Sequence, residues 1–454
     1  MRIINVLFIP TFFVSLLIAM AVWMNIRDIS MDDPPGGSRR DNVFYDNIGL
    51  HLAQGKGFVL DFENPHWLKT YENDSRNNWV FRSKLAGPTA KRAPCYPYCL
   101  SVLYRVFGRD WVIVRIFNYL ALAAGLTILV AVLRKHFGSP IAAVTAACLL
   151  FDFAILGMAG ELMAESLATG LFSVTFAAVI WAWSGTDSGD TNDDRRAGSW
   201  RWAVVGILFA LTALVRSNFY GWLILLVLLS VLWLTFLVLR KRFVRPFAGG
   251  MVAFLLAASL ICFPWWARNC NVTGNLAPFG TAGTTGLVGG YSDGALENYG
   301  NWDVGSAADC GARFGNTHYA ELAKMSLAEQ EYLIGQQSLR ESRAWAIENW
   351  RQVPLLMTYK ALSHLRLIQQ PDWNIALNAV LLILAAVGCI AYWRQFGFWV
   401  VIIVFLSTAA TMLTWSGLGR YSVPMRPVIQ CAVGAGMVCV WVQAIKYFRP
   451  ASDE

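Results

Sequence analysis

The sequence predicts an all-α polytopic membrane protein, with about ten transmembrane helices in a single membrane domain, 1–454. Of its residues, 56 % are hydrophobic and only 15 % are charged, against about 25 % charged in an ordinary soluble domain. Several apolar runs reach the roughly 20 residues that a helix needs to cross a bilayer. The basic residues gather in alternate loops between these runs. Together these observations exclude a soluble enzyme, a disordered chain and a small disulfide-stabilised domain.

The predicted spans are runs in which apolar residues dominate, and a helical rise of about 1.5 Å per residue lets each cover most of the hydrocarbon core. In chain order they are 3–24, 111–133, 139–156, 161–183, 202–216, 217–239, 246–267, 374–393, 396–414 and 424–445. The third and the fifth are the shortest.

Basic residues in the short loops predict which side of the membrane each loop faces. With the N-terminus in the cytoplasm, thirteen basic residues lie on the inside and three lie in short outer loops: Arg216, Arg420 and Arg426. The thirteen are Arg2, Arg134, Lys135, Arg195, Arg196, Arg201, Arg240, Lys241, Arg242, Arg245, Arg394, Lys446 and Arg449. We therefore expect a protein of the cell (inner or plasma) membrane with both termini cytoplasmic. The net charge of +8 reflects this topology, and no nucleic-acid partner is expected.

This topology places two long segments on the extracytoplasmic side, 26–110 and 268–373. The first outer segment lies between the first span, 1–25, and spans two to seven, 111–267. The second lies between span seven and the last part of the chain, 374–454, which contains spans eight to ten and a short cytoplasmic tail.

Two short helices are expected in the first outer segment. Apolar residues recur every four positions from Phe44 to Leu52, so the helix in 41–58 is expected to lie in the membrane interface, with His51 facing away from the apolar stripe. The apolar stretch 96–107 is too short to span and predicts a second in-plane or re-entrant helix.

The second outer segment contains one clear helix signal. Ser326-Leu-Ala-Glu329 has the pattern of a capping box, which predicts a helix from there to about Trp350. The stretch 271–315 is rich in Gly, Asn and Thr and is expected to be loop. Cys270 and Cys310 both lie outside, where an oxidising compartment allows a disulfide. The sequence leaves both alternatives open for this pair, a disulfide or two free thiols.

Ionisable groups near the outer membrane face are the candidates for chemistry, because a membrane protein keeps charges at membrane depth only at a cost. Three acids cluster around one outer turn and three arginines lie at the outer ends of other spans: Asp152, Glu161 and Glu165, and Arg216, Arg268 and Arg420. Carboxylates suit a general base or a divalent cation, and arginines bind phosphate bidentately. Together they indicate chemistry on a lipid-linked phosphate that is reached from outside.

Each of these residues also has a purely structural interpretation. Acids in a long outer segment, such as Asp46, are commonly solvated, and an arginine at a helix end commonly extends to lipid headgroups. Glu165 lies in an otherwise apolar stretch, where function is the better interpretation. Four histidines lack metal-ligand spacing and are interpreted as surface or interface residues: His51, His66, His318 and His364.

Seven short motifs follow one another along the chain, each near the predicted outer face. They are Asp41-Asn-Val-Phe-Tyr45, Leu52-Ala-Gln-Gly-Lys-Gly-Phe58, Pro88-Thr-Ala-Lys91-Arg92-Ala-Pro-Cys-Tyr96-Pro97, Ala164-Glu165-Ser-Leu167, Leu211-Thr-Ala-Leu-Val-Arg216, Pro264-Trp-Trp-Ala-Arg268-Asn269 and Gly419-Arg420-Tyr421-Ser-Val-Pro424. As an ordered set they resemble the motifs of bacterial GT-C glycosyltransferases. That family includes the dolichyl-phosphate-mannose–protein mannosyltransferase-like and aminoarabinose-transferase-like membrane proteins.

The resemblance implies a GT-C-type helical bundle whose large first extracytoplasmic loop carries interfacial helices. It also implies an activity: transfer of a hexosyl or pentosyl group from a polyprenyl-phosphate donor to a lipid, glycan or protein acceptor on the extracytoplasmic face. The transfer is expected to be a single inverting displacement. A divalent metal stays open, and no other cofactor is implied.

The resemblance further implies roles for individual residues. Asp41 is expected to be the general base, with Asp32 or Asp33 as the next candidates. Glu165 is expected to orient the base or to help hold a divalent cation. Cations in the motifs are expected to bind the donor phosphate, and tyrosines to position the substrate: Arg92, Lys91, Arg216, Arg268 and Arg420, and Tyr45, Tyr96 and Tyr421.

Two other functions are compatible with these residues. A transporter or flippase of lipid-linked sugars needs the same phosphate-binding cations, but also polar or broken helices near the bilayer midplane, whereas the acids here collect at the outer rim. A non-catalytic membrane scaffold would tolerate the replacement of each carboxylate.

Overall fold

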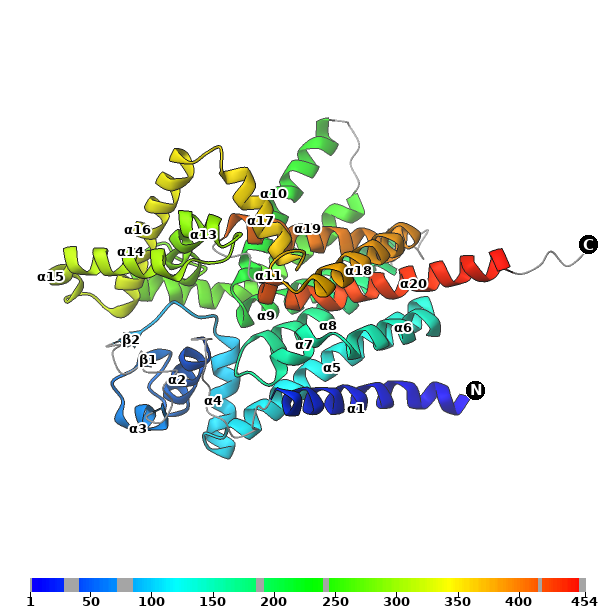
Figure 1. Cartoon of the computed structure of the whole chain (residues 1–454), viewed down its shortest axis with the longest axis horizontal. Coiled ribbons are helices and arrows are strands. Elements are labelled where there is room, and N and C mark those ends of the chain that lie inside the picture. Colours follow the sequence, from blue (N-terminus) through cyan, green and yellow to red (C-terminus); the bar gives the residue numbers. More distant parts are fainter. Residues whose placement is uncertain are drawn as a thin grey trace, which may run out of the picture.

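The computed structural model describes residues 2–27, 41–71, 85–184, 192–239, 245–414 and 419–448. Most long helices run side by side along the long axis of the molecule (Figure 1). The start of α1 (Arg2–Ile26) and the end of α20 (Arg426–Phe448) lie at one end of this bundle, and the short helices and strands between residues 41 and 107 lie at the other. The alternative bases Asp32 and Asp33 lie outside the described residues.

Seven helices in the described part of the chain are long and apolar enough to cross a membrane. They are α1, α5 (Trp111–Phe137), α8 (Glu165–Ser184), α11 (Arg245–Thr273), α18 (Asp372–Ala391), α19 (Phe398–Leu413) with the π-helical turn η5 (Trp393–Gly397), and α20. The bent pair α6 (Ser139–Leu150) and α7 (Phe153–Ala159) is an eighth candidate, while α9 (Asn192–Val215) and α10 (Asn218–Leu239) contain shorter apolar stretches. The polytopic helical class is confirmed, and the number of ten spans stays a prediction.

The predicted span 139–156 is not one straight helix. The chain bends by 60° between α6 and α7. At the bend, the side chain of Asp152 accepts hydrogen bonds from the backbone N–H groups of Ala154 and Ile155, so it caps the start of α7. Its carboxylate also accepts hydrogen bonds from Arg426 at 2.7 Å and from Gln430 at 2.7 Å. Asp152 thus ties this bend to α20.

Helices α5 and α8 cross with their backbones in contact. A Cβ atom on Gly125 would lie 2.3 Å from the carbonyl oxygen of Gly170, and a Cβ on Gly170 would lie 2.5 Å from that of Ala121. Small residues at such a crossing are what allow two membrane helices to approach closely. The crossing fixes α8, whose first residue is Glu165.

The described part of the first outer segment forms a group of short elements at the end of the bundle and packs against it. It consists of α2 (Asp41–Ala53), β1 (Val59–Asp61), α3 (Pro65–Leu68), η1 (Lys69–Tyr71), β2 (Ala86–Pro88) and α4 (Cys95–Phe107), with β1 and β2 antiparallel. Ten of the thirteen residues of α2 are buried, His51 among them, so α2 does not lie in an interface as expected. Helix α4 leaves Tyr98, Val102 and Val106 exposed along one face, and its in-plane or re-entrant position stays a prediction.

Asp46 forms the centre of this group. Its carboxylate is fully buried and accepts hydrogen bonds from Trp67 Nε1 at 2.7 Å and from the hydroxyls of Tyr71 and Tyr104, both at 2.9 Å. Arg109 forms an ion pair with it. A buried charge with this many donors is stabilised in place, so Asp46 is structural rather than solvated.

The second outer segment is more helical than its composition predicts. It contains α12 (Ala282–Thr285), η4 (Leu287–Gly290), α13 (Asp293–Glu297), α14 (Val304–Thr317), α15 (Tyr319–Leu322), α16 (Leu327–Glu348) and α17 (Val353–His364). The capping box at the start of α16 is confirmed, with Ser326 and Glu329 bonded reciprocally. The expectation of loop over 271–315 is wrong for α14, because Asp303 caps its first turn and Cys310 is buried.

Two further interpretations of the sequence concern residues between 268 and 373. Cys270 and Cys310 are free thiols in the structure. His364, interpreted above as a surface or interface residue, is fully buried, and its imidazole contacts the hydroxyls of Ser407 at 2.8 Å and Thr411 at 3.2 Å. The tertiary contact between α17 and α19 covers it.

Candidate active site

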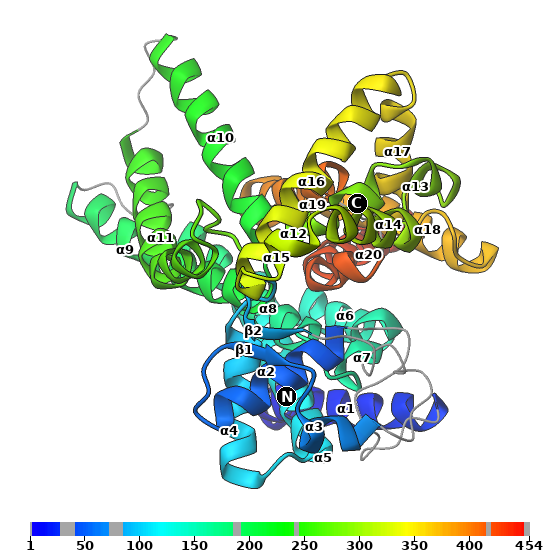
Figure 2. The ribbon, with the colours of Figure 1, turned by 90° about the vertical axis from the view of Figure 1, so that its left-hand side faces the viewer.

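Five chain segments meet where the outer segments join the bundle. They are the start of α2, the turn before α4, the start of α8, the residue after α9, and η6 (Gly419–Met425). Figure 2 faces this end of the molecule and places α2, β2 and α8 near the middle of the view. Each segment contributes one charged side chain from the motifs: Asp41, Arg92, Glu165, Arg216 and Arg420.

Asp41 lies between two arginines. Arg92 donates a hydrogen bond to its Oδ1 at 2.6 Å, and Arg420 donates one to its Oδ2 at 3.0 Å. The Asp41 side chain remains 24 % exposed. Burial by itself would raise the pKa of this carboxyl, but the charges of Arg92, Arg420 and Arg216 outweigh it and lower the pKa to about 2.

Glu165 and Arg216 form a second ion pair in the same cluster. The distance from Arg216 Nη1 to Glu165 Oε1 is 2.8 Å, and both side chains are almost completely buried. The ring of Tyr421 joins this pair to the first, because Arg216 Cζ lies 4.8 Å and Arg420 Cζ 5.2 Å from its centroid. Arg420 also donates a hydrogen bond to the Tyr421 hydroxyl at 3.2 Å.

The cluster carries more positive than negative charge. The cations Arg92, Arg216 and Arg420 face two carboxylates, those of Asp41 and Glu165, which leaves one positive charge in excess. Within the described part of the chain, the buried Nε atoms of Arg92 and Arg420 have no hydrogen-bond partner. Buried donors are normally satisfied, so these guanidinium groups are suited to an additional anion.

Tyr45 and Tyr96 lie next to the first ion pair. Their rings pack edge to face with centroids 5.2 Å apart, and Arg92 Cζ lies 5.8 Å from the Tyr45 ring. Asn118 donates a hydrogen bond to the Tyr96 hydroxyl at 3.2 Å. Tyr45 packs against Arg92, and Tyr96 packs against Tyr45. The role of both tyrosines in positioning a substrate stays a prediction.

Lys91 and Arg268 form no ion pair with Asp41 in the described part of the chain, although Lys91 approaches the same Phe44 ring as Arg92, whose Cζ lies 4.7 Å from the ring centroid. The Lys91 ammonium lies 5.6 Å from the Phe44 ring, and burial lowers the pKa of this lysine. Arg268 donates hydrogen bonds to the carbonyl oxygens of Thr89 at 2.6 Å and Phe58 at 3.1 Å. Its donors therefore join backbone segments, and the structure does not bring Arg268 into the cluster around Asp41.

In the second outer segment, the buried charged residues Glu331 and Lys360 were not among the sequence candidates. Glu331 on α16 accepts hydrogen bonds next to the Lys91–Arg92 turn. Lys360 on α17 donates to the carbonyl oxygen of Thr414 at 2.6 Å, and burial lowers its pKa to about 7. Neither residue stands in a motif, and each has ordinary helical neighbours, so no local signal distinguishes it from a solvated side chain.

The fit of a divalent cation can be tested on the same groups. The described residues contain no group of three or more His, Cys, Asp and Glu side chains placed to hold a metal ion. The carboxylates of Asp41 and Glu165 are both engaged by arginines. We therefore derive no step through a metal.

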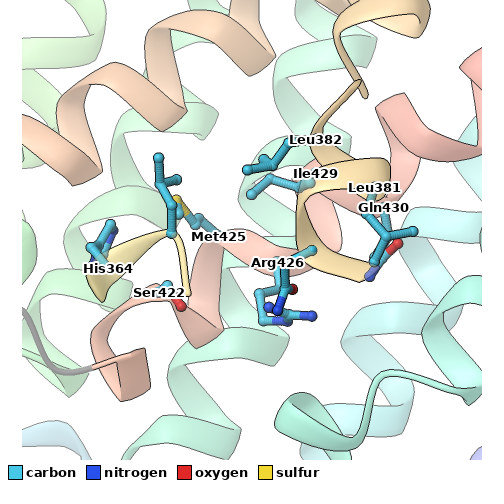
Figure 3. Close-up of a pocket in the computed structure, with 10 residues that line it drawn as sticks. His364, Leu381, Leu382, Ser422, Met425, Arg426, Ile429 and Gln430 are labelled. Carbon is cyan, nitrogen blue, oxygen red and sulfur yellow. The ribbon is translucent and has the colours of Figure 1, made fainter. Parts of the chain in front are cut away.

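A small cavity lies beside the cluster, between α17, α18, η6 and α20 (Figure 3). His364, Ser422 and Gln430 provide polar atoms in its wall, and Leu381 and Ile429 provide apolar ones. Arg426, which also lines it, is paired with Asp152. The groups that bind Asp41 do not line this cavity.

Comparisons with known proteins place the fold. No protein-family model and no curated protein sequence matches the chain. The oligosaccharyltransferase of Archaeoglobus fulgidus, tethered with an acceptor peptide, is similar with a TM-score of 0.54 and 12 % identity, over 98 % of this chain and 51 % of that chain. The chain thus spans about half the length of that protein.

Two further structures are more distant. AglB of Archaeoglobus fulgidus, in complex with an inhibitory peptide and a dolichol-phosphate, has a TM-score of 0.49 and 13 % identity over 98 % of this chain and 52 % of that one. ArnT of Cupriavidus metallidurans, bound to undecaprenyl phosphate, has a TM-score of 0.38 and 12 % identity over 95 % of this chain and 78 % of that chain. The protein is a multi-pass membrane protein with the fold of the GT-C glycosyltransferases, as its motifs lead one to expect.

Proposed function

We propose that the protein transfers a sugar from a polyprenyl-phosphate-linked donor to a hydroxyl of a lipid, glycan or protein acceptor on the extracytoplasmic face. The observation that carries this proposal is the position of the Asp41 carboxylate between Arg92 and Arg420. The pair combines a base with phosphate-binding cations within hydrogen-bond distance of each other. The GT-C fold supports the reaction class, and the order of the motifs supports the residue assignment.

The arginines are the proposed site of the donor phosphate. A guanidinium binds phosphate oxygens with two parallel N–H bonds, and the unfilled Nε donors of Arg92 and Arg420 are available for this purpose. Arg216 adds a further positive charge next to Tyr421. When the bond between the sugar and the phosphate breaks, the phosphate leaves as an anion, and these cations stabilise it without protonation.

Asp41 is the proposed general base. It accepts the proton of the acceptor hydroxyl while that oxygen forms a bond to the anomeric carbon, and the phosphate oxygen leaves with the electron pair on the opposite face. In the free protein the two arginines make Asp41 a weak base. A donor phosphate competes for the same guanidinium groups, so donor binding raises the basicity of Asp41 when a substrate is present.

Glu165 is proposed to orient the cluster rather than to take a proton. Its carboxylate is buried and paired with Arg216, which in turn lies over the ring of Tyr421. This contact fixes one side of the aromatic ring against which Arg420 packs.

The decisive experiment measures transfer of a radiolabelled sugar from defined polyprenyl-phosphate donors by the purified protein. Asp41→Asn keeps the size of the side chain and removes the base, so we expect transfer to fall by about 10²- to 10⁴-fold. Asp293→Asn is the matched control, because Asp293 is exposed and only accepts a hydrogen bond from Trp345. Transfer by Asp41→Asn protein at the wild-type rate would contradict the assignment.

The same preparation distinguishes the transporter or flippase. Reconstituted in vesicles, such a protein would move a fluorescent lipid-linked sugar between leaflets without cleaving it, and Asp41→Asn would leave that movement intact. We expect cleavage and transfer instead.

A further inference from the structure

The segment that carries Lys91 and Arg92 is held by the second outer segment, although some 240 residues separate them in sequence. Glu331 Oε1 accepts a hydrogen bond from the Thr89 hydroxyl at 2.6 Å. Glu331 Oε2 accepts one from the Ala90 N–H at 3.0 Å and one from the Thr281 hydroxyl at 3.1 Å. One carboxylate therefore holds two consecutive residues immediately before Lys91.

The two backbones also touch directly at this place. The N–H of Thr281 donates to the carbonyl oxygen of Ala90 at 3.0 Å. Gly280 has a φ of +79°, and a Cβ atom there would lie 2.3 Å from the same oxygen. Only glycine permits this approach, because a side chain would collide and the left-handed backbone would be strained. The contact is therefore close-fitting and specific to these residues.

The carboxylate of Glu331 is expensive to bury. The residue is 6 % exposed, and in the described part of the chain no Lys or Arg forms an ion pair with it, although the charges of Lys91 and Arg268 act on it from farther away. Its three partners are neutral donors, Thr89, Ala90 and Thr281, which are themselves buried. Three donors compensate for lost hydration only if their geometry is fixed, so the group acts as a rigid bracket for the turn.

This bracket lies two residues from the guanidinium that binds Asp41. The chain passes from Ala90 through Lys91 to Arg92, whose Nη2 lies 2.6 Å from Asp41 Oδ1. A guanidinium must be placed to within a fraction of an ångström to bind a phosphate bidentately. Movement of Ala90 would therefore be passed directly to Arg92.

We propose that Glu331 is a positioning residue for the donor-phosphate site, which holds the turn at Thr89 and Ala90 so that Arg92 reaches Asp41. The inference rests on the proposed function for the identity of the anion. It goes further in assigning a part of the site to α16, so that the second outer segment shapes a phosphate site whose ligands come from the first.

The test uses the purified full-length protein in lipid nanodiscs, with undecaprenyl phosphate as the probe. Glu331→Ala should weaken its binding roughly tenfold to hundredfold, the range expected when one charge-assisted hydrogen bond to phosphate is lost. Glu331→Gln keeps an oxygen acceptor and should stay within about threefold of wild type. Glu341→Ala is the matched control, because it removes from the same helix a carboxylate whose partners are exposed Arg313, Gln337 and the Cys310 thiol and not the turn at Ala90.

A double-mutant cycle separates positioning from a general loss of stability. If Glu331 acts through Arg92, then Glu331→Ala should have no further effect on binding in an Arg92→Ala background. Additive losses would overturn the proposal, and so would equal losses in Glu331→Gln and Glu331→Ala.

Hydrogen exchange of residues 85–93 provides a readout that does not depend on the ligand. Exchange should be faster in Glu331→Ala and also in Thr281→Val, a milder change that removes one of the three donors, and unchanged in Glu341→Ala. Unchanged exchange in both of the first two variants would overturn the proposal. If wild-type protein binds no undecaprenyl phosphate, the proposed function is contradicted, and the exchange data still decide whether Glu331 holds the turn.

Discussion

At the scale of single residues, the partners of each outer carboxylate decide what it can do. Asp46 is saturated by aromatic donors and Arg109, and Asp152 by helix N–H groups together with Arg426 and Gln430. Neither has a lone pair available for a substrate hydroxyl. Among the residues that the structure describes, only arginines pair with Asp41, whose side chain is about one quarter exposed. It can release these partners to an anion, which is why it is the proposed base.

The pH dependence of transfer should report this pairing. In wild type the pKa of Asp41 is lowered to about 2, so kcat/KM, which reflects the free enzyme, should show no acid limb from Asp41 above about pH 4. Arg420→Gln removes a cation that stabilises the carboxylate. The pKa should therefore rise by about 1 to 2 units, and activity should be lost at a correspondingly higher pH.

Arg313→Gln is the control for this profile, because Arg313 is exposed and forms its ion pair with Glu341 rather than with Asp41. In wild type, the acid limb of kcat should lie at a higher pH than that of kcat/KM. The reason is that the arginines bind the donor phosphate in the enzyme–substrate complex and then stabilise the Asp41 carboxylate less. Superimposable profiles for wild type and Arg420→Gln would show that Asp41 is not the titrating base.

At the scale of elements, the cluster around Asp41 consists mainly of residues at the ends of helices or directly after them. Asp41 and Glu165 are the first residues of α2 and α8, Arg216 follows the last residue of α9, and Arg420 lies in η6. Helix starts favour carboxylates, because their free N–H groups carry partial positive charge. The precision of the site therefore depends on how the helices behind it pack.

Gly170→Ala tests this dependence at the α5–α8 crossing. The added methyl group would lie 2.5 Å from the Ala121 carbonyl oxygen, so the helices must separate. We expect a loss of stability of about 1 to 3 kcal/mol, typical of overpacking, and slower transfer because Glu165 shifts with α8. Thermal unfolding in detergent and the transfer assay measure the two effects.

Gly311→Ala is the matched control, because a Cβ atom there meets nothing within 4 Å. It should leave both thermal unfolding and transfer unchanged. An unaltered melting temperature in Gly170→Ala would mean that the crossing does not set the position of α8.

At the scale of the whole molecule, the described parts of the outer segments lie at the opposite end of the bundle from the start of α1 and the end of α20 (Figure 1). The basic loops predict that the end carrying α1 and α20 faces the cytoplasm. The cluster around Asp41 then faces outward, where a lipid-linked sugar would have to be presented for the proposed reaction.

Reporter fusions check this orientation. Green fluorescent protein at the C-terminus should fluoresce, and alkaline phosphatase at the same place should be inactive, because the former folds in the cytoplasm and the latter outside it. Alkaline phosphatase fused after Trp350, in the second outer segment, should be active. Active phosphatase at the C-terminus would reverse the proposed side of the reaction.

Sequence by itself determined the membrane class, the positions of the seven long apolar helices in the described part of the chain and the capped start of α16. These features depend on local quantities: the transfer free energy of about 20 successive side chains, and hydrogen bonds within one turn. The ordered motifs also named Asp41, Arg92, Arg216, Glu165 and Arg420, which the structure brings together.

Only the tertiary structure decided which charges are partners. It buried His51 and His364, bent the chain at Asp152 and assigned Arg268 to backbone carbonyls. It also placed Glu331 against Ala90, across some 240 residues. Spacing along a chain specifies neighbours on one helix, but contacts between distant segments depend on how complete faces pack. The residues that bind Asp41 could therefore be named in advance, whereas the residue that holds them in place could not.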